Sequence, residues 1–487
     1  MTTTQAAPTG FDPALRRLAL VVALGAIMTI LDSTIVNVAI NTLGRDFGAS
    51  LSTIQWVVTA YTLALSMTIP ITGWVIGRFG AKTMWLVSLA LFLAGSALCG
   101  AAWSAPSLIA FRVLQGIGGG LLMPVGQSML ARAAGPHRMG RAMAVIAVPG
   151  MLAPVLGPVL GGALLDHLSW HWLFYVNVPF CAAALVLAVR MLPPDEERRT
   201  GDRLDLIGLA LLSPGLAALV YGLSLIGGSP GAGAPAAITA GAALTAAFVV
   251  WSLRRGERAL LDLRVFRHRA FATATGSLFF YSAALFGLIV LLPLYYQIIR
   301  GESVLDSGLL IAPMGLGAIV TMPPAGRLTD RFGSRGLGVA GICLVLAGML
   351  AYTRIDAGTP LPWLAGVLFV VGLGHGLVVP SMSAAFYQGM PRAAIPAATT
   401  TSNIVIRVAT SLGVAVLAVV LQARLRAGVP GADGTLADAA AHGREAAASV
   451  AEAFSGSFWW ALAIAAPAVL AAVLVPRKPA PAPAPQD

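Results

Sequence analysis

Apolar residues fill most of this chain in long runs, which short polar segments interrupt along nearly its whole length. A helix that crosses a bilayer needs about 20 apolar residues, and about fourteen helices of that kind fit into the chain. The pattern therefore predicts an all-α membrane protein, surrounded mainly by lipid. The expected spans are 15–42, 52–76, 82–102, 106–131, 141–165, 172–191, 205–227, 233–253, 271–299, 304–326, 336–354, 361–387, 394–423 and 455–476.

Composition and charge agree with this class. Of 487 residues, 57% are hydrophobic and 10% are charged, whereas soluble domains carry roughly 25% charged residues. Most of the 31 Lys and Arg residues fall in loops on one side, so the positive-inside rule places those loops and both termini in the cytoplasm. The net charge of +11 thus reflects topology, not a nucleic-acid-binding surface. Cys99, Cys181 and Cys343 lie in apolar runs and are expected to be small buried residues, without a disulfide or metal.

A repeated motif divides the chain. The segments 73–80 and 326–333 both read G-x-x-x-x-R-F-G, and each follows the second span of a group of six. Duplicated transporters leave such copies. We expect a six-helix bundle over 1–191, cytoplasmic connectors with two inserted helices over 192–270, and a second six-helix bundle over 271–476. The second bundle includes an external loop, 424–454, and a disordered Pro-rich tail follows at 477–487.

One acidic residue, Asp32, falls deep inside the first apolar run. The other acids are placed in loops, tails or span ends. A carboxylate inside a bilayer is costly and usually marks an ion or substrate pathway. Two interpretations stay open: a carboxylate that only holds neighbouring helices together, or a proton site where proton and substrate compete. We favour the second, because acids within membrane spans most often serve a function, and such competition would couple transport to proton flow.

Several segments resemble, in their order and spacing, signatures of the fourteen-span drug:proton antiporters of the major facilitator superfamily. The resemblance covers nearly the whole chain. It implies the major facilitator fold, two six-helix bundles with two inserted helices, and alternating access that a proton gradient drives without a cofactor. The segments are LDSTIVNVAI (31–40), QWVVTAYTL (55–63), FRVLQGIGGG (111–120), GMLAPVLGPVLGG (150–162), WHWLFYVNVP (170–179) and LLPLYYQ (291–297).

Arg112 lies in the fourth-span segment of this resemblance. Counted along the helices, Arg112 is about 9 Å deep and Asp32 about 15 Å deep, so an arginine side chain can close the gap. Snorkelling toward the outer interface would also explain Arg112. We expect Arg112 to form a proton relay with Asp32. His375, in GLGHGL, is either a further titratable group or a satisfied buried histidine.

Two groups of residues are expected to control gating. In the repeated motif, the resemblance implies that an acid before the arginine holds the N-terminus of a neighbouring helix at the cytoplasmic side. The first copy has Gly77 there and the second keeps Asp330. The Gly- and Pro-rich fifth span is either ordinary tight contact or a pliable seam between the halves. The gating residues are Gly73, Arg78, Gly80, Lys82, Gly150, Pro154, Gly157, Pro158, Gly161, Gly162, Gly326, Asp330, Arg331 and Gly333.

Polar and aromatic residues within the spans supply the expected substrate pocket. An aromatic pocket with one acid suits lipophilic cations. Each residue alone also has a structural explanation, such as the aromatic belt at the membrane interface, and for Arg407 both pairing and pore lining stay open. The pocket candidates are Asn37, Tyr61, Phe280, Tyr281, Gln297, Asn403 and Arg407.

These features predict a monomeric antiporter of the bacterial inner membrane that exports lipophilic compounds, including cationic drugs or antibiotics, in exchange for protons. The Gly-rich strings lack the strand and acid of a dinucleotide site, and we find no phosphate-binding loop, so no nucleotide is expected as partner. The distribution of the basic residues gives no reason to expect a nucleic acid either. Two alternatives stay open. One is an exporter of a specific metabolite, peptide, siderophore or lipid, and the other is a membrane sensor or enzyme on a transporter scaffold.

Overall fold

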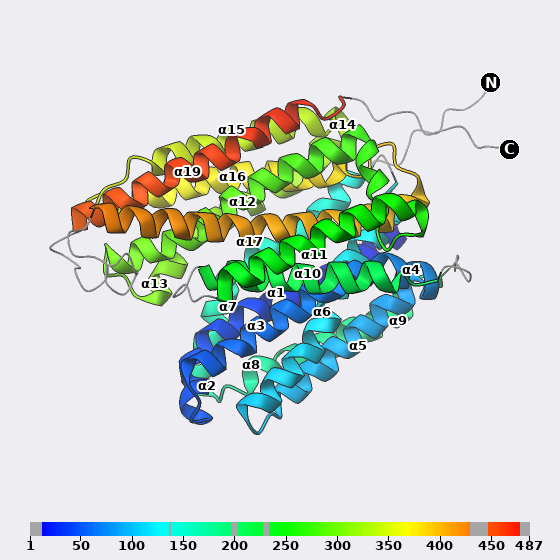
Figure 1. The fold of residues 1–487 in the computed structure, drawn as a ribbon, viewed down its shortest axis with the longest axis horizontal. Helices are drawn as coiled ribbons and strands as arrows, with labels where there is room; N and C mark the ends of the chain where they lie inside the picture. Colours follow the sequence, from blue (N-terminus) through cyan, green and yellow to red (C-terminus); the bar gives the residue numbers. More distant parts are fainter. Residues whose placement is uncertain (1–11, 136–137, 196–202, 227–232, 429–446, 478–487) are drawn as a thin grey trace.

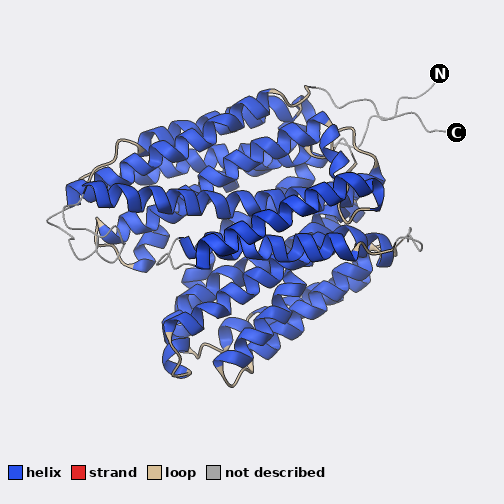
Figure 2. Cartoon of the chain, in the orientation of Figure 1, coloured by secondary structure: helices blue, strands red, loops and turns tan. Residues whose placement is uncertain are grey.

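The fold is built from long helices in a computed structural model that describes residues 12–135, 138–195, 203–226, 233–428 and 447–477. No strand occurs among these residues, as Figure 2 shows. Within them, 13 helical segments are long and apolar enough to cross a membrane. Helix α7 (Met139–His167) coincides with the remaining expected span. The all-α membrane architecture predicted from the apolar runs is confirmed.

The N-terminal group of helices surrounds α1. Helix α1 contacts α6, α7 and α9, while α6 also contacts α3 and α5. The second expected span is divided by a 3-10 turn at Ile69–Ile71, where Pro70 removes a backbone donor. The helices are α1 (Pro13–Ile35), α2 (Ile40–Asp46), α3 (Leu51–Thr68), α4 (Thr72–Phe79), α5 (Ala81–Gly100), α6 (Ala105–Ala134), α7, α8 (Trp172–Tyr175) and α9 (Asn177–Met191).

The C-terminal group repeats this pattern of long neighbouring helices. Helix α16 contacts α14 and α15, and α12 contacts α17 and α19. The helices are α12 (Arg269–Ile298), α13 (Val304–Leu309), α14 (Ala312–Phe332), α15 (Ser334–Tyr352), α16 (Leu361–Ala385), α17 (Ile395–Gly428) and α19 (Ala447–Val473).

The two groups meet along two seams. Helix α7 contacts α14 and α16, and α6 contacts α17. The inserted helices α10 (Leu206–Ile226) and α11 (Gly233–Arg255) lie against each other, and α10 also contacts α3 and α17. Figure 1 shows this inserted pair between the C-terminal group above and the N-terminal group below. The inserted helices therefore bridge one side of the boundary between the groups.

Both described ends of the chain lie at one end of the bundle, which we call the terminal face. Asp12, just before α1, pairs with Arg138 just before α7. The carbonyl oxygen of Arg477, after α19, lies 3.0 Å from the position of a Cβ on Gly333, just before α15. The terminal face is therefore the end at which α7 and α15 begin.

Some expectations about segment boundaries are wrong. The expected external loop 424–454 is partly helical, because α17 continues to Gly428 and α19 begins at Ala447. Leu, Ala and Arg at 423–427 are good helix formers. Residues 429–446 and the expected tail at 478–487 lie outside the described residues. Cys99 and Cys181 are buried, but Cys343 is exposed on α15, where it meets lipid if α15 spans the membrane. The domain limits remain predictions.

Candidate functional site

Asp32 lies on α1 with none of its surface exposed. Its carboxylate accepts three hydrogen bonds, from Arg112 Nη1 to Oδ2 at 2.6 Å, from Gln115 Nε2 to Oδ1 at 2.8 Å and from Asn177 Nδ2 to Oδ1 at 3.0 Å. A buried ion pair is tolerated only when further hydrogen bonds satisfy the atoms that lost water. The three donors meet this requirement for the carboxylate.

Arg112 on α6 is held from several sides. Its Nε donates to the carbonyl oxygen of Val57 at 3.1 Å, and its Nη1 donates to Gln115 Oε1 at 2.7 Å. Its guanidinium carbon lies 3.9 Å from the centre of the Tyr61 ring, a distance suited to a cation–π contact. Arg112 is fully buried, so its side chain reaches Asp32 rather than the membrane interface. Tyr61 therefore supports Arg112 in this structure.

Sequence reasoning missed the two amides that bind Asp32. Gln115 follows Arg112 by three positions on the same helix, so both side chains share one face. Asn177 begins α9 and also lies 3.2 Å from Ser96 Oγ, which in turn donates to the carbonyl oxygen of Phe174 at 2.9 Å. Both amides stand inside segments that the family resemblance had marked. A polar residue in those apolar runs was the available signal.

Glycines on α6 permit the close helix contacts around this network. A Cβ on Gly116 would lie 2.7 Å from the carbonyl oxygen of Tyr61, and a Cβ on Gly95 of α5 would lie 2.7 Å from Gln115 Cβ. Contacts this short exclude any side chain, so α3, α5 and α6 can approach closely only through glycine. The GIGGG string thus has a structural use here.

Two predicted pocket residues on α17 contact helices of the N-terminal group and take no part in the Asp32 network. Asn403 Nδ2 on α17 donates to Gln127 Oε1 on α6 at 2.6 Å, and Arg407 Nε on α17 lies 3.4 Å from Ser66 Oγ on α3. None of the ion pairs found within the described ranges includes Arg407. Among the described residues, the Arg407 guanidinium therefore has a hydroxyl group in contact but forms no ion pair with a carboxylate.

His375 on α16 belongs to a separate contact in the C-terminal group. Its Nδ1 lies 2.6 Å from the hydroxyl oxygen of Tyr281 on α12, and both residues are buried. A satisfied buried histidine fits this geometry. The remaining pocket candidates are dispersed: Asn37 is exposed after α1, Phe280 is 36% exposed, and Gln297 stands in the last turn of α12. The structure does not gather the predicted pocket into one site.

A latch between the groups is present at the terminal face, formed by Asp330, Gly140 and Arg141. Asp330 Oδ1 accepts the backbone N–H of Gly140 at 2.7 Å, and Oδ2 accepts Arg141 Nε at 2.8 Å. A Cβ on Gly326 would lie 2.9 Å from the carbonyl oxygen of Gly140, so α14 crosses α7 there by close backbone contact. Arg331 takes no part and lies over Phe332.

The N-terminal copy of the motif binds within its own group. Asp195, after α9, accepts the backbone N–H of Lys82 at 2.8 Å and that of Thr83 at 3.1 Å. Lys82 Nζ donates to the carbonyl oxygen of Leu192 at 2.6 Å. Gly80 has φ +91, as Gly333 has φ +88 at the matching position of the other copy, a conformation that favours glycine. Sequence reasoning missed Asp195.

The fifth-span glycines that are described contact α1. A Cβ on Gly161 would lie 3.1 Å from Ile35 Cγ1, a Cβ on Gly157 would collide with Thr34, and Gly162 has open space around it. Gly157 and Gly161 therefore bring α7 close to α1 within the N-terminal group. This position fits ordinary tight contact and does not fit a seam between the halves. Gly150, Pro154 and Pro158 also lie in α7. Across the described ranges, no group of three potential metal ligands occurs.

Comparison with known proteins identifies the family. The sequence model described as Major Facilitator Superfamily matches residues 22–414. The chain belongs to this family. Its members are transporters rather than enzymes, so the chain is a many-span membrane transporter.

Relatives and a solved structure agree with the family. A multidrug resistance protein B homolog of Mycobacterium tuberculosis is 40% identical over 423 residues, 85% of this chain and 77% of that protein. A putative multidrug resistance protein MdtD of Klebsiella pneumoniae is 31% identical over 409 residues, 82% and 85% of the two chains. The human organic anion transporter MFSD10 shares the fold, with TM-score 0.62 and 19% identity over 93% of this chain and all of that one.

Proposed function

We propose that this transporter exports lipophilic compounds, drugs or antibiotics among them, in exchange for protons. The observation that supports proton coupling best is the buried ion pair between Asp32 and Arg112. An ionisable residue within a membrane span is costly and most often serves transport of ions or protons. The multidrug resistance names of two relatives support the substrate class.

In this proposal Asp32 exchanges its proton when the transporter changes state. The carboxylate is out of contact with water here, so a proton reaches it only after the helices around it move. Protonation removes the charge that attracts Arg112. The guanidinium keeps an acceptor nevertheless, because Arg112 Nη1 also bonds Gln115 Oε1. Gln115 thereby limits the cost of leaving a buried cation without its carboxylate.

We infer that the terminal face is cytoplasmic and that the protein resides as a monomer in a bacterial inner membrane. Basic residues gather at that face, Lys82, Arg138 and Arg141 among them. Loops rich in Lys and Arg remain on the cytoplasmic side of a membrane. The orientation predicted from loop charges is retained in this proposal.

The test is transport by Asp32→Asn in proteoliposomes under an imposed pH gradient. A panel of lipophilic cationic, neutral and anionic dyes covers the substrate classes. We expect gradient-driven accumulation to be lost, while exchange of labelled for unlabelled dye without a gradient continues. Asp12→Asn is the matched control, because it removes an exposed acid and an asparagine still caps α1. Full gradient-driven accumulation by Asp32→Asn would show that the proton site is elsewhere.

A further inference from the structure

Both copies of the repeated motif contact the opposite helix group, but among the described residues only the second makes a close backbone crossing there with a hydrogen bond to a side-chain carboxylate. Gly326 crosses the start of α7, where a Cβ would lie 2.9 Å from Arg141 Cα. The matching Gly73 lies beside the start of α17, where a Cβ would lie 3.7 Å from Thr400 Oγ1. Asp330 then holds α7 through Gly140. The residue that matches Asp330 is Gly77, which has no side chain to hold α17.

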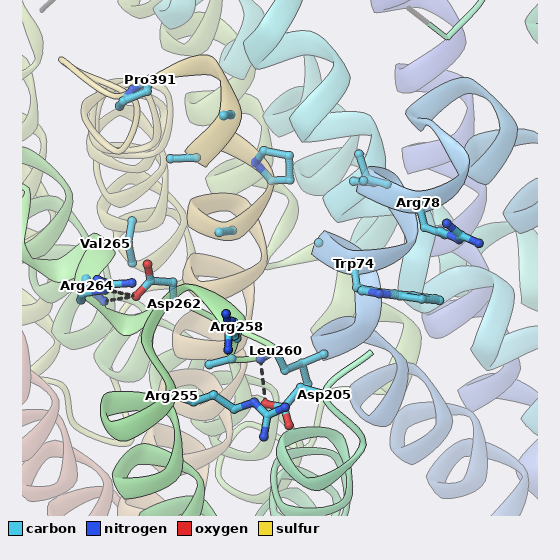
Figure 3. A pocket seen from close by; sticks show the side chains of 18 of the residues that line it. Trp74, Arg78, Asp205, Arg255, Arg258, Leu260, Asp262, Arg264, Val265 and Pro391 are labelled. Carbon is cyan, nitrogen blue, oxygen red and sulfur yellow. Dashed lines mark hydrogen bonds and ion pairs between the residues drawn. The ribbon is translucent and has the colours of Figure 1, made fainter. Parts of the chain in front are cut away.

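A cavity of about 880 Å³ occupies the place that such a side chain would face. Gly73 and Gly77 line it on one side, and Pro391, Ala394 and Pro396 at the start of α17 line it on another. The connector before α12 forms a further wall. Figure 3 shows Arg258 of that connector between Trp74 of α4 and the Asp262–Arg264 pair. The missing carboxylate therefore coincides with an open space at the terminal face.

Among the residues that the structure describes, the lining of the cavity is strongly basic. Two aspartates line it, and both are engaged: Asp205 accepts the backbone N–H of Leu260 at 3.0 Å, and Asp262 pairs with Arg264 at 2.9 Å. Arg132 lines it as well, and its Nε is buried without a hydrogen-bond partner among the described residues. The six arginines of the lining are Arg78, Arg132, Arg203, Arg255, Arg258 and Arg264.

We propose that this cavity binds a phosphate group, which takes the place of the carboxylate that Gly77 lacks. Guanidinium groups match the oxygen atoms of phosphate and bind them by paired hydrogen bonds. The positive end of a helix dipole at the start of α17 adds to the attraction. The bound phosphate links the connector and α4 to α17, as Asp330 links α14 to α7. It therefore stabilises the state in which the terminal face is closed.

The phosphate can belong to an anionic lipid headgroup or to a soluble ion, since the terminal face lies where the membrane surface meets the aqueous phase. The inference rests on membership in the transporter family and not on proton coupling. Loss of transport in Asp32→Asn therefore leaves it unaffected, and its own failure leaves the proton site unaffected.

The test measures closure of the terminal face in the full chain. Spin labels replace the exposed Arg190 of α9 and Phe332 of α14, one in each group, and Cys343→Ser removes the exposed thiol. The chain is placed in nanodiscs of phosphatidylcholine, with or without inorganic phosphate, and in nanodiscs containing phosphatidylglycerol. We expect at least one phosphate source to increase the closed population. Inorganic phosphate acting alone identifies the soluble ion, and phosphatidylglycerol acting alone identifies the headgroup.

Variants separate this site from general surface charge. Arg132→Gln and Arg258→Gln should each weaken the apparent affinity for the effective source about tenfold, the scale of one charge-assisted hydrogen bond. Arg327→Gln removes an exposed arginine of α14 outside the cavity and should have no effect. Gly77→Asp should close the terminal face in phosphatidylcholine nanodiscs to which neither inorganic phosphate nor phosphatidylglycerol is added. The proposal is overturned if neither source acts, if Arg327→Gln weakens binding as much as Arg258→Gln, or if Gly77→Asp still requires phosphate.

Discussion

Asp330 of α14 accepts the backbone N–H of Gly140, the second residue of α7, at 2.7 Å. This hydrogen bond crosses between the two helix groups at the terminal face. Arg141 adds a second contact to the same carboxylate at 2.8 Å. Within the described residues, the matching position of the other copy, Gly77, contributes no such bond. Among the described residues, the repeated motif therefore supplies this hydrogen bond between the helix groups from its second copy and not from its first.

Removing the charge of Asp330 should release this latch. Asp330→Asn keeps the size of the side chain but loses the ion pair with Arg141 and weakens the bond to Gly140. Hydrogen bonds to charged groups contribute about 1.5–3 kcal/mol, so the closed population should fall roughly tenfold or more relative to the open one. The spin-label distance between α9 and α14 measures this ratio. The neighbouring Arg331→Gln is the control, and equal effects of both variants would refute the assignment.

The crossing of α7 and α14 should require glycine at Gly140. A Cβ there would lie 2.5 Å from the carbonyl oxygen of Gly326, so Gly140→Ala must separate the helices. We expect a lower midpoint of thermal unfolding, with a cost of about 1–3 kcal/mol, as for overfilled cores. Gly336→Ala is the matched control, because open space surrounds Gly336 on α15. Alanine there should be neutral or stabilising by up to about 1 kcal/mol. Similar unfolding midpoints for both variants would contradict the close crossing.

Arg407 should influence which substrate charge is transported. Its guanidinium lies where α17 meets α3 and has hydroxyl contact but no carboxylate in the described ranges. At about 10 Å and an effective dielectric constant of 20, one charge changes the energy of a charged substrate by about 1.7 kcal/mol. Arg407→Gln should therefore favour the cation by about 1.7 kcal/mol and disfavour the anion by as much, which shifts the ratio of cationic to anionic dye transport toward the cation by roughly two orders of magnitude. An unchanged ratio, measured with dyes of matched size, would place Arg407 outside the pathway.

Asp12 should make the first turn of α1 sensitive to acid. The backbone N–H of Leu15 and, next, the side chain of Arg138 lower the pKa of this carboxyl below its usual value. A carboxyl whose folded pKa is depressed stabilises the fold above its unfolded pKa, about 3.9, and this stabilisation disappears as the pH falls through the folded pKa. Hydrogen exchange at Leu15, corrected for intrinsic rates, should show less protection at that low pH. Asp12→Asn should show no such dependence.

The sequence by itself determined the class and the family. Long apolar runs leave no other stable structure than membrane helices, since backbone groups in lipid must bond within their own segment. The same reasoning identified Asp32, because a charge inside such a run is costly wherever the helix is placed. The repeat was also visible, and the matching positive φ of Gly80 and Gly333 fits it.

Only the tertiary structure decided which partners these residues have. Gln115 and Asn177 lie far along the chain from Asp32, and Asp195 lies far from Lys82, so periodicity gives no indication of these contacts. The same holds for the pocket candidates, which are all polar or aromatic residues but come from several helices. Gly157 and Gly161 were expected either in ordinary tight contact or at a seam between the halves, and they lie against α1. An apolar membrane helix presents similar residues all around, so its sequence fixes that it crosses the bilayer but not which neighbour each side meets.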